Sequence, residues 1–230
     1  MRLYLSIIIL VLLTAAAMSA NAQGTFRNLN FESANVAGDS RVTQIPIVNA
    51  FPGWSATETE ASFGTQSLTQ VYYDALALGS PLIAVNDNEL GSGSLPPPLQ
   101  GSFSAYISGG NGFAFSLMQT GVVPFESKSL LVDIQDDAFG LQTTINGNLI
   151  NMVPLYDNSI YTVYGGDISA FAGELDQLAF TEPGFPSGIG AATIDDIQFS
   201  PNLVPEPGVW SLILCGTAFF GFTRKKGGRD

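Results

Sequence analysis

Residues 143–150 read TTINGNLI, and this stretch decides the fold class that we predict for the chain. Asn146 and Gly147 stand at its centre, and an Asn-Gly pair suits the two positive φ angles of a type I′ turn. β-branched and apolar residues flank the pair on both sides, which is typical of paired strands. The stretch therefore predicts an antiparallel β-hairpin, the simplest unit of an all-β domain.

The same pattern extends in both directions along the chain. Short stretches rich in β-branched and aromatic residues alternate with clusters of Gly, Pro, Asn and Asp. They predict strands at 43–49, 67–73, 82–86, 102–108, 113–118, 129–135, 141–146, 149–154, 159–164, 175–181 and 192–199. A Gly-Gly-Asn-Gly turn at 109–112 joins two of them, and residues 87–99, with three consecutive prolines, predict a long surface loop. Many short antiparallel strands indicate a β-sandwich.

Three separated motifs narrow this prediction. Asn28-x-x-Phe31-Glu32 is followed by Pro52-Gly53-Trp54 and, near the end of the domain, by residues 194–199, IDDIQF. This frame resembles jelly-roll domains of the galactose-binding-like and carbohydrate-binding-module type. The resemblance implies an all-β, antiparallel β-sandwich of jelly-roll type over residues 23–201, with its first and last strands close together.

The resemblance also implies a structural calcium site at Glu32, Asp195 and Asp196. Calcium takes six to eight oxygen ligands, which carboxylates on adjacent strands can supply. Successive strand residues point to opposite faces, so only one of Asp195 and Asp196 is expected to be a ligand. The alternative is that these acids are solvated at the end of a strand. No other cofactor is predicted.

The N-terminus predicts a secretory signal peptide over residues 1–22. Arg2 supplies the positive charge, residues 3–17 are apolar, and Ala20-Asn21-Ala22 forms a signal peptidase site. The mature chain would then start at Gln23. An uncleaved N-terminal anchor is the alternative.

The last residues, 202–230, predict a linker and a membrane tail. Pro205-Glu206-Pro207 precedes an apolar run at 208–223, and a basic cluster follows it, made of Arg224, Lys225, Lys226 and Arg229. As a helix the run would span about 24 Å, less than the roughly 30 Å of a bilayer core. Cationic flanks stay in the cytoplasm, which places the domain outside. The basic cluster would act as the membrane stop.

The order of these three parts resembles the PEP-CTERM sorting signal of bacterial exosortase substrates. The resemblance implies that exosortase, a membrane-embedded cysteine protease-like enzyme, processes the chain near Pro205, Glu206 and Pro207. The protein would be exported, held transiently in the inner membrane, and then placed at the cell surface or in the extracellular matrix. The two interrupting glycines, Gly227 and Gly228, and the terminal Asp230 depart from the family pattern.

Composition excludes several functions. Between residues 23 and 207 three cations face 19 acids, a net charge of −16, so nucleic acid is excluded as a partner. The chain has no histidine, and its only cysteine, Cys215, lies in the apolar tail. Ser-His-Asp and Cys-His catalysis, standard zinc sites and internal disulfides are therefore excluded. No enzyme is predicted, although a pair of carboxylates could still form a glycosidase site.

Two further groups of residues are weaker candidates. Asp133, Asp136 and Asp137 form a second acidic group, without the spacing of an EF-hand. A sugar-stacking platform could use Trp54, Tyr72, Tyr73, Phe113 or Phe115, although Phe113 and Phe115 share a strand face that we expect to point into the core. The expected role of the domain is structural or adhesive, in surface or biofilm material. The alternative is a carbohydrate-binding domain for extracellular polysaccharide, with or without calcium.

Overall fold

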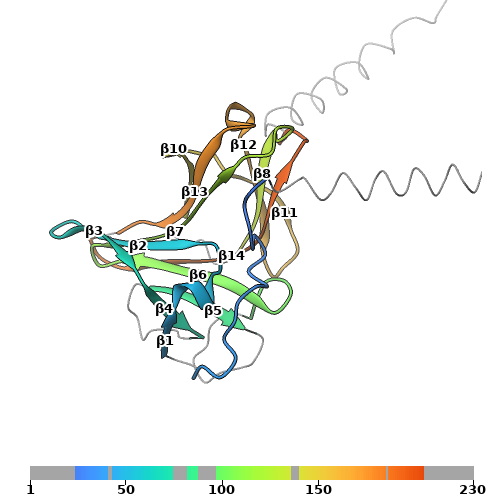
Figure 1. Ribbon diagram of the computed structural model, residues 1–230. Coiled ribbons are helices and arrows are strands. Elements are labelled where there is room, and N and C mark those ends of the chain that lie inside the picture. Colours follow the sequence, from blue (N-terminus) through green and yellow to red (C-terminus); the bar gives the residue numbers. More distant parts are fainter. Residues whose placement is uncertain are drawn as a thin grey trace, which may run out of the picture.

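The computed structural model describes residues 24–40, 43–74, 82–87, 97–135, 140–184 and 186–204 (Figure 1). The predicted signal peptide, the Pro205-Glu206-Pro207 motif, the apolar run with Cys215, the basic cluster, and Asp136 and Asp137 lie outside these residues. None of the helices in the described ranges is both long and apolar enough to cross a bilayer.

The described chain is almost entirely β-structure. Its strands are β1 (Thr43–Pro46), β2 (Ser55–Glu60), β3 (Gly64–Leu68), β4 (Gln70–Tyr73), β5 (Leu82–Asp87), β6 (Phe103–Gly110), β7 (Phe113–Val122), β8 (Ser129–Gln135), β9 (Gln142–Ile145), β10 (Asn148–Leu149), β11 (Val153–Asp157), β12 (Thr162–Asp167), β13 (Leu175–Glu182) and β14 (Ile189–Ser200). The helical elements are one turn, α2 (Ile47–Ala50), and a 3₁₀ turn, η1 (Ser169–Phe171).

These strands form an antiparallel β-sandwich of jelly-roll type, as predicted. Hydrogen bonding is continuous through all 14 strands, but β6 and β7 pair only at Gly110 and Phe113, where the sheet folds over. A first layer has the order β3-β2-β7-β13-β9-β10, and a second layer has the order β1-β4-β5-β6-β14-β8-β12-β11. One pair, β4 with β5, is parallel.

Gly110 makes the fold between the layers sterically possible. Its φ of +137° is open to glycine, and a Cβ there would lie 2.2 Å from the carbonyl oxygen of Gly188. The next turn residue, Asn111, has a φ of +52°. The Gly-Gly-Asn-Gly sequence thus supplies both the conformation and the close backbone approach that this corner needs.

One hydrophobic core fills the space between the layers. It joins residues from both, including Leu117 and Phe180 of the first layer and Ile107, Val132 and Ile194 of the second. Because alternate residues of a strand point to opposite faces, their neighbours Ser104, Asp133, Thr193 and Asp195 lie on the outer face of the second layer.

The N-terminal segment, residues 24–31, packs against the last strand, β14. The first strand, β1, does not lie beside β14 as the resemblance implied, because β4, β5 and β6 lie between them in the sheet. The rings of Phe26 and Phe199 stack with centroids 5.0 Å apart, and Ile197 donates its N–H to the carbonyl of Leu29 at 3.0 Å. The indole of Trp54 donates to the carbonyl of Asn28 at 3.1 Å. The three motifs of the frame therefore meet in space.

Most predicted strands are present, with four main differences. Residues 47–50 form α2 instead of continuing β1, and the strands predicted at 67–73 and 149–154 are each divided between two strands. Strand β2, with the sequence SATETE, was not predicted. Only Ala56 is buried on it, so its alternation of Thr and Glu carries no apolar signal. The Asn146-Gly147 turn has the predicted positive φ angles, +50° and +76°.

Candidate functional site

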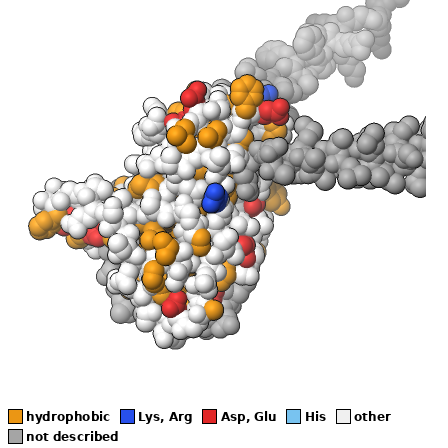
Figure 2. Space-filling model, viewed as in Figure 1, with side chains coloured by type: hydrophobic (Ala, Val, Ile, Leu, Met, Phe, Trp, Pro, Cys, Tyr) orange, Lys and Arg blue, Asp and Glu red, His pale blue; other side chains and the backbone are white. Residues whose placement is uncertain are grey.

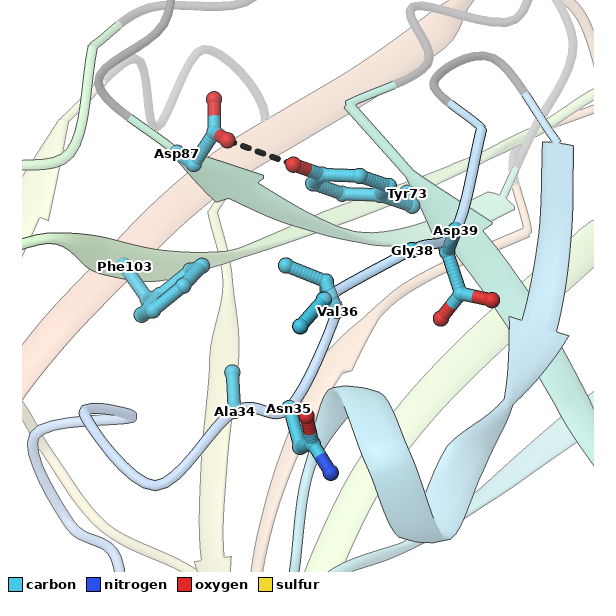
Figure 3. Close-up of a pocket in the computed structure, with 9 residues that line it drawn as sticks. Ala34, Asn35, Val36, Gly38, Asp39, Tyr73, Asp87 and Phe103 are labelled. Carbon is cyan, nitrogen blue, oxygen red and sulfur yellow. Dashed lines mark hydrogen bonds between the residues drawn. The ribbon is translucent and has the colours of Figure 1, made fainter.

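A hollow of about 510 Å³ opens between the segment 34–39 and the ends of strands β4, β5 and β6 (Figure 3). Tyr73 and Asp87 form one wall, where the Tyr73 hydroxyl donates to Asp87 Oδ2 at 2.6 Å. Phe103 and Val36 face the middle of the hollow, and Asp39 and Asn35 lie on its other side. Pairing of Tyr73 with Val85 and of Asp87 with Phe103 fixes this arrangement.

The chemistry of this hollow suits a neutral or cationic polar ligand. Two carboxylates and an amide offer hydrogen bonds around the apolar surface of Phe103 and Val36. A few polar groups around an apolar floor are typical of small-ligand sites. The two carboxylates disfavour an anionic ligand. No local pattern marks Asp39, Asn35 or Phe103, because the hollow joins segments far apart in the chain.

A second candidate is an acidic cluster on the outer face of the second layer. Asp133 of β8 and Asp195 of β14 are direct cross-strand partners, and both are buried, with exposed fractions of 4% and 1%. A β-bulge follows Asp195, and Asp196 has a φ of +42° there. Since a bulge re-aims side chains, the Asp196 carboxylate also reaches the cluster.

Gln100 connects the three carboxylates. Its Nε2 donates to Asp133 Oδ2 at 2.7 Å, to Asp196 Oδ2 at 3.3 Å and to the Tyr161 hydroxyl at 3.2 Å, while its backbone N–H donates to Asp195 Oδ2 at 3.0 Å. Gln198 also donates to Asp196. Residues 99–102, which we call the strap, therefore lie across this face of the sheet, and Gln100 of the strap covers the buried acids.

Burial changes the protonation of this cluster. It raises the pKa of Asp195 to about 7, against the opposing effect of hydrogen bonds from Ser104 and from the backbone N–H groups of Asp196 and Gln100. Burial likewise raises the pKa of Asp133, and the hydrogen bond from Gln100 opposes that rise. Burial, followed by the nearby Asp133 charge, raises the pKa of the Tyr161 hydroxyl. Paired acids of raised pKa occur at functional sites and in structural networks alike.

Buried polar atoms extend beyond the cluster on the same face. Thr193 pairs with Gln135 across β14 and β8, and Asn86 pairs with Ser104 across β5 and β6. Thr193 Oγ1, Gln135 Oε1 and both side-chain polar atoms of Asn86 are buried without a hydrogen-bond partner. Such atoms are commonly satisfied by bound water.

The three residues predicted to bind calcium have other partners. Glu32 Oε1 accepts the backbone N–H groups of Ser102 at 2.7 Å and Phe103 at 3.0 Å, which anchors the end of the strap. Asp195 accepts the Ser104 hydroxyl at 2.8 Å. In the described part of the chain, no group of three or more His, Cys, Asp or Glu residues is placed to hold a metal ion. Calcium binding stays a prediction.

The aromatic residues considered for sugar stacking divide between core and surface. Trp54, Tyr73 and Phe115 are buried in the core, and the Trp54 ring lies 5.6 Å from Phe31 and 6.3 Å from Phe180. Tyr72 and Phe113 are half-buried. The expectation that Phe113 and Phe115 point toward the core agrees with the structure.

Comparison with known proteins assigns the chain to no family. No family model matches it, and no curated protein matches its sequence. Similar solved structures include a cyclase from Fischerella sp. TAU in complex with 4-(1H-indol-3-yl)butan-2-one, which is 14% identical with a TM-score of 0.44 and covers 76% of this chain and 94% of its own.

Two further structures show similar distant likeness. One is the enzymatically active domain of tailspike protein 4 from bacteriophage CBA120, with 13% identity, a TM-score of 0.40, and coverage of 75% of this chain but 21% of its own. The other is a family 11 carbohydrate-binding module from Clostridium thermocellum in complex with a β-1,3-1,4-mixed-linked tetrasaccharide, with 10% identity, a TM-score of 0.31, and coverage of 70% and 96%. Likeness at these TM-scores does not bear on ligand or activity.

Proposed function

We propose that this chain is an exported envelope or extracellular-matrix protein that exosortase sorts through its C-terminal tail. The observation that carries the proposal is the order of the tail: Pro205-Glu206-Pro207, the apolar run 208–223, and the basic cluster. Signal peptidase would release the N-terminus before Gln23. The sandwich would then have a structural or adhesive role on the outside of the cell.

The way the domain ends is compatible with processing near the motif. Strand β14 ends at Ser200, whose carbonyl accepts the Lys128 N–H at 2.8 Å, and the Asn202 carbonyl accepts the Ser129 hydroxyl at 2.8 Å. Cleavage near Pro205 would therefore leave all the described strands intact.

Intact mass and membrane fractionation of the native protein test this proposal. The expected mature chain starts at Gln23 and ends near Glu206, while a variant with Pro205→Ala and Pro207→Ala keeps its tail and stays in the inner membrane. Pro201→Ala changes a proline directly before the linker, is the matched control, and should be processed like the wild type. A wild-type chain that keeps Arg229 and stays in the membrane would make the tail a plain anchor.

A second candidate role is saccharide binding in the hollow of Figure 3. The observation that favours it is the set of carboxylate and amide groups around the ring of Phe103, since sugars present hydroxyl donors around apolar ring faces. Neutral polysaccharides are the expected ligands, because the net charge of −16 between residues 23 and 207 repels acidic ones.

Binding to an array of neutral and acidic glycans tests this role. Asn35 and Asp39 are exposed, so Asn35→Ala and Asp39→Asn should lower binding at least fivefold without affecting folding. Glu174→Gln changes an exposed acid outside the hollow and is the control. Equal binding by all three variants would exclude the hollow as the binding site.

A further inference from the structure

The described sheet has four strands with a neighbour on one side only: β1, β3, β10 and β11. An open strand edge exposes unpaired N–H and C=O groups that can pair with another strand. Natural proteins block such edges with very short strands, prolines, bulges or charged side chains. An edge strand without any of these features can pair with an added strand.

Three of these edges carry a blocking feature. Strand β10 is two residues long, and β1 is four residues long and ends in Pro46. Strand β11 contains Pro154 and Asp157, and its pairing with β12 is irregular between Pro154 and Tyr156. Each feature interrupts the regular row of backbone groups that an added strand would need.

Strand β3 carries none of these features. Its five residues, GTQSL, include no charge and no proline, and its register with β2 is regular from Gly64 to Leu68. Gly64, Thr65, Gln66 and Ser67 are exposed, and Leu68 is half-buried. Figure 1 shows the β2–β3 hairpin reaching out to the left of the body, where nothing described covers its outer edge.

We propose that β3 pairs antiparallel with β3 of a second copy of this chain. A strand that pairs with itself in this way forms a two-fold, isologous contact, which closes at a dimer. Charge favours β3 over other surfaces for this contact. Acids outnumber cations by 19 to three between residues 23 and 207, so two copies repel each other over most of their surfaces, whereas β3 has no charged residue.

The exposed ring of Phe63 gives the same contact an apolar part. Phe63 lies in the turn directly before β3 and is 74% exposed. In a pairing centred on Gln66, residue 63 of one copy lies opposite residue 69 of the other, next to the half-buried Leu68. Figure 2 shows hydrophobic side chains at the end of the projecting part on the left.

The contact is small and therefore weak in dilute solution. Five paired residues extend about 17 Å, and so short an edge cannot bury the roughly 800 Å² per partner of a standard stable interface. Crowding of many copies on one surface would raise the effective concentration and favour pairing. The contact itself does not require exosortase sorting, so the two proposals can fail independently.

Disulfide cross-linking tests the pairing, because Cys215 is the only cysteine. The full chain with Cys215→Ser is purified in detergent, and Gln66→Cys is added at the two-fold centre. A disulfide needs roughly 4.4–6.8 Å between the two Cα atoms. In a two-fold antiparallel pair, a residue lies this close to the same residue of the other copy only near the two-fold centre. Mild oxidation should give at least fivefold more dimer on a non-reducing gel than Glu174→Cys, an exposed control outside β3.

Two further comparisons keep the result specific. Adding Thr65→Lys and Ser67→Lys to Gln66→Cys places like charges opposite each other and should reduce the dimer at least fivefold. Raising the salt concentration should increase the dimer of the original Gln66→Cys chain, because it screens repulsion between acidic domains. Equal cross-linking of the Gln66→Cys and Glu174→Cys chains, no effect of the lysines, or cross-linking only to a different protein would overturn the proposal.

Discussion

Asp133 and Asp195 lie opposite each other on neighbouring strands, and one residue, Gln100, donates a hydrogen bond to both. The side chain of Gln100 binds Asp133 at 2.7 Å and its backbone N–H binds Asp195 at 3.0 Å. Burial disfavours the charged form of both carboxylates and raises the pKa of each, and the nearby Asp196 charge acts in the same direction. The folded protein therefore holds a proton in this cluster that the unfolded chain would release.

This proton makes stability depend on pH. The pKa of Asp195 is raised from 3.8 to about 7 in the folded state, so its contribution is greatest below pH 4 and is lost as the pH rises to about 7. The raised pKa of Asp133 acts in the same direction. We expect the free energy of unfolding to fall by on the order of 3 kcal/mol across this window. Urea denaturation at pH 4.5 and pH 8 measures it.

Asp195→Asn separates this contribution from those of other acids. Asp167, for example, has its pKa lowered by the hydrogen bond from Ser169 and contributes in the opposite direction. The variant should lose stability at pH 4.5 and show a much smaller change between pH 4.5 and pH 8. A change with pH as large as that of the wild type would show that Asp195 does not hold the proton.

Gln100→Glu tests the strap directly. The substitution keeps the shape of the side chain but brings a further negative charge to Asp133 and Asp196. We expect a loss of about 1 to 3 kcal/mol at pH 8 and a smaller loss at pH 4.5, since the buried Asp133 carboxylate loses its hydrogen-bond donor. Gln198→Glu is the control, because Gln198 is exposed like Gln100 and also donates to Asp196, whereas Gln100 in addition donates to the buried Asp133. Similar losses for the two variants would contradict a special role for Gln100.

Gly110 and Gly112 differ in what surrounds them, although both have positive φ angles. A Cβ on Gly110 would meet backbone at 2.2 Å, whereas nothing lies within 4 Å of a Cβ on Gly112. We expect Gly112→Ala to cost about 1 kcal/mol from conformation alone, and Gly110→Ala to cost clearly more. Thermal unfolding of the two variants compares them, and equal costs would mean that the corner can relax.

Glu32→Ala separates two roles for this carboxylate. Loss of its two backbone hydrogen bonds predicts a cost of about 1 to 3 kcal/mol that is the same with calcium and with EDTA. The calcium hypothesis predicts instead that EDTA lowers the melting temperature of the wild type and has no effect on the variant. Because Glu32 already accepts two N–H groups, we expect the first result.

Local sequence was sufficient for most of the fold. Turns such as Asn146-Gly147 were predictable because positive φ angles depend on the residues at the turn itself. Strands with a buried face, such as β8 and β13, were predictable from their apolar residues. Strand β2 was not, because polar residues occupy it and its place is decided by pairing with β7.

The neighbours within the acidic cluster could not be predicted from the sequence. Asp195 was singled out by a motif, but its partners Ser104 and Gln100 were not, because they lie 91 and 95 residues away along the chain. Asp133 was expected in a group with Asp136 and Asp137, which lie outside the described residues, and its cross-strand partner Asp195 was not expected. Cross-strand register decides such neighbours, and register depends on the whole sheet.

The sequence by itself determined the all-β class, the acidic character of the domain, and the tail that leads us to propose export and sorting. These properties depend on composition and on residues next to each other in the chain. Only the tertiary structure decided that Asp133 shares Gln100 with Asp195 and Asp196, that a hollow forms beside Tyr73 and Asp87, and that β3 is the unblocked edge among the described strands. The physical reason is that burial, raised pKa values and open edges arise only when strands far apart in sequence pair in one register.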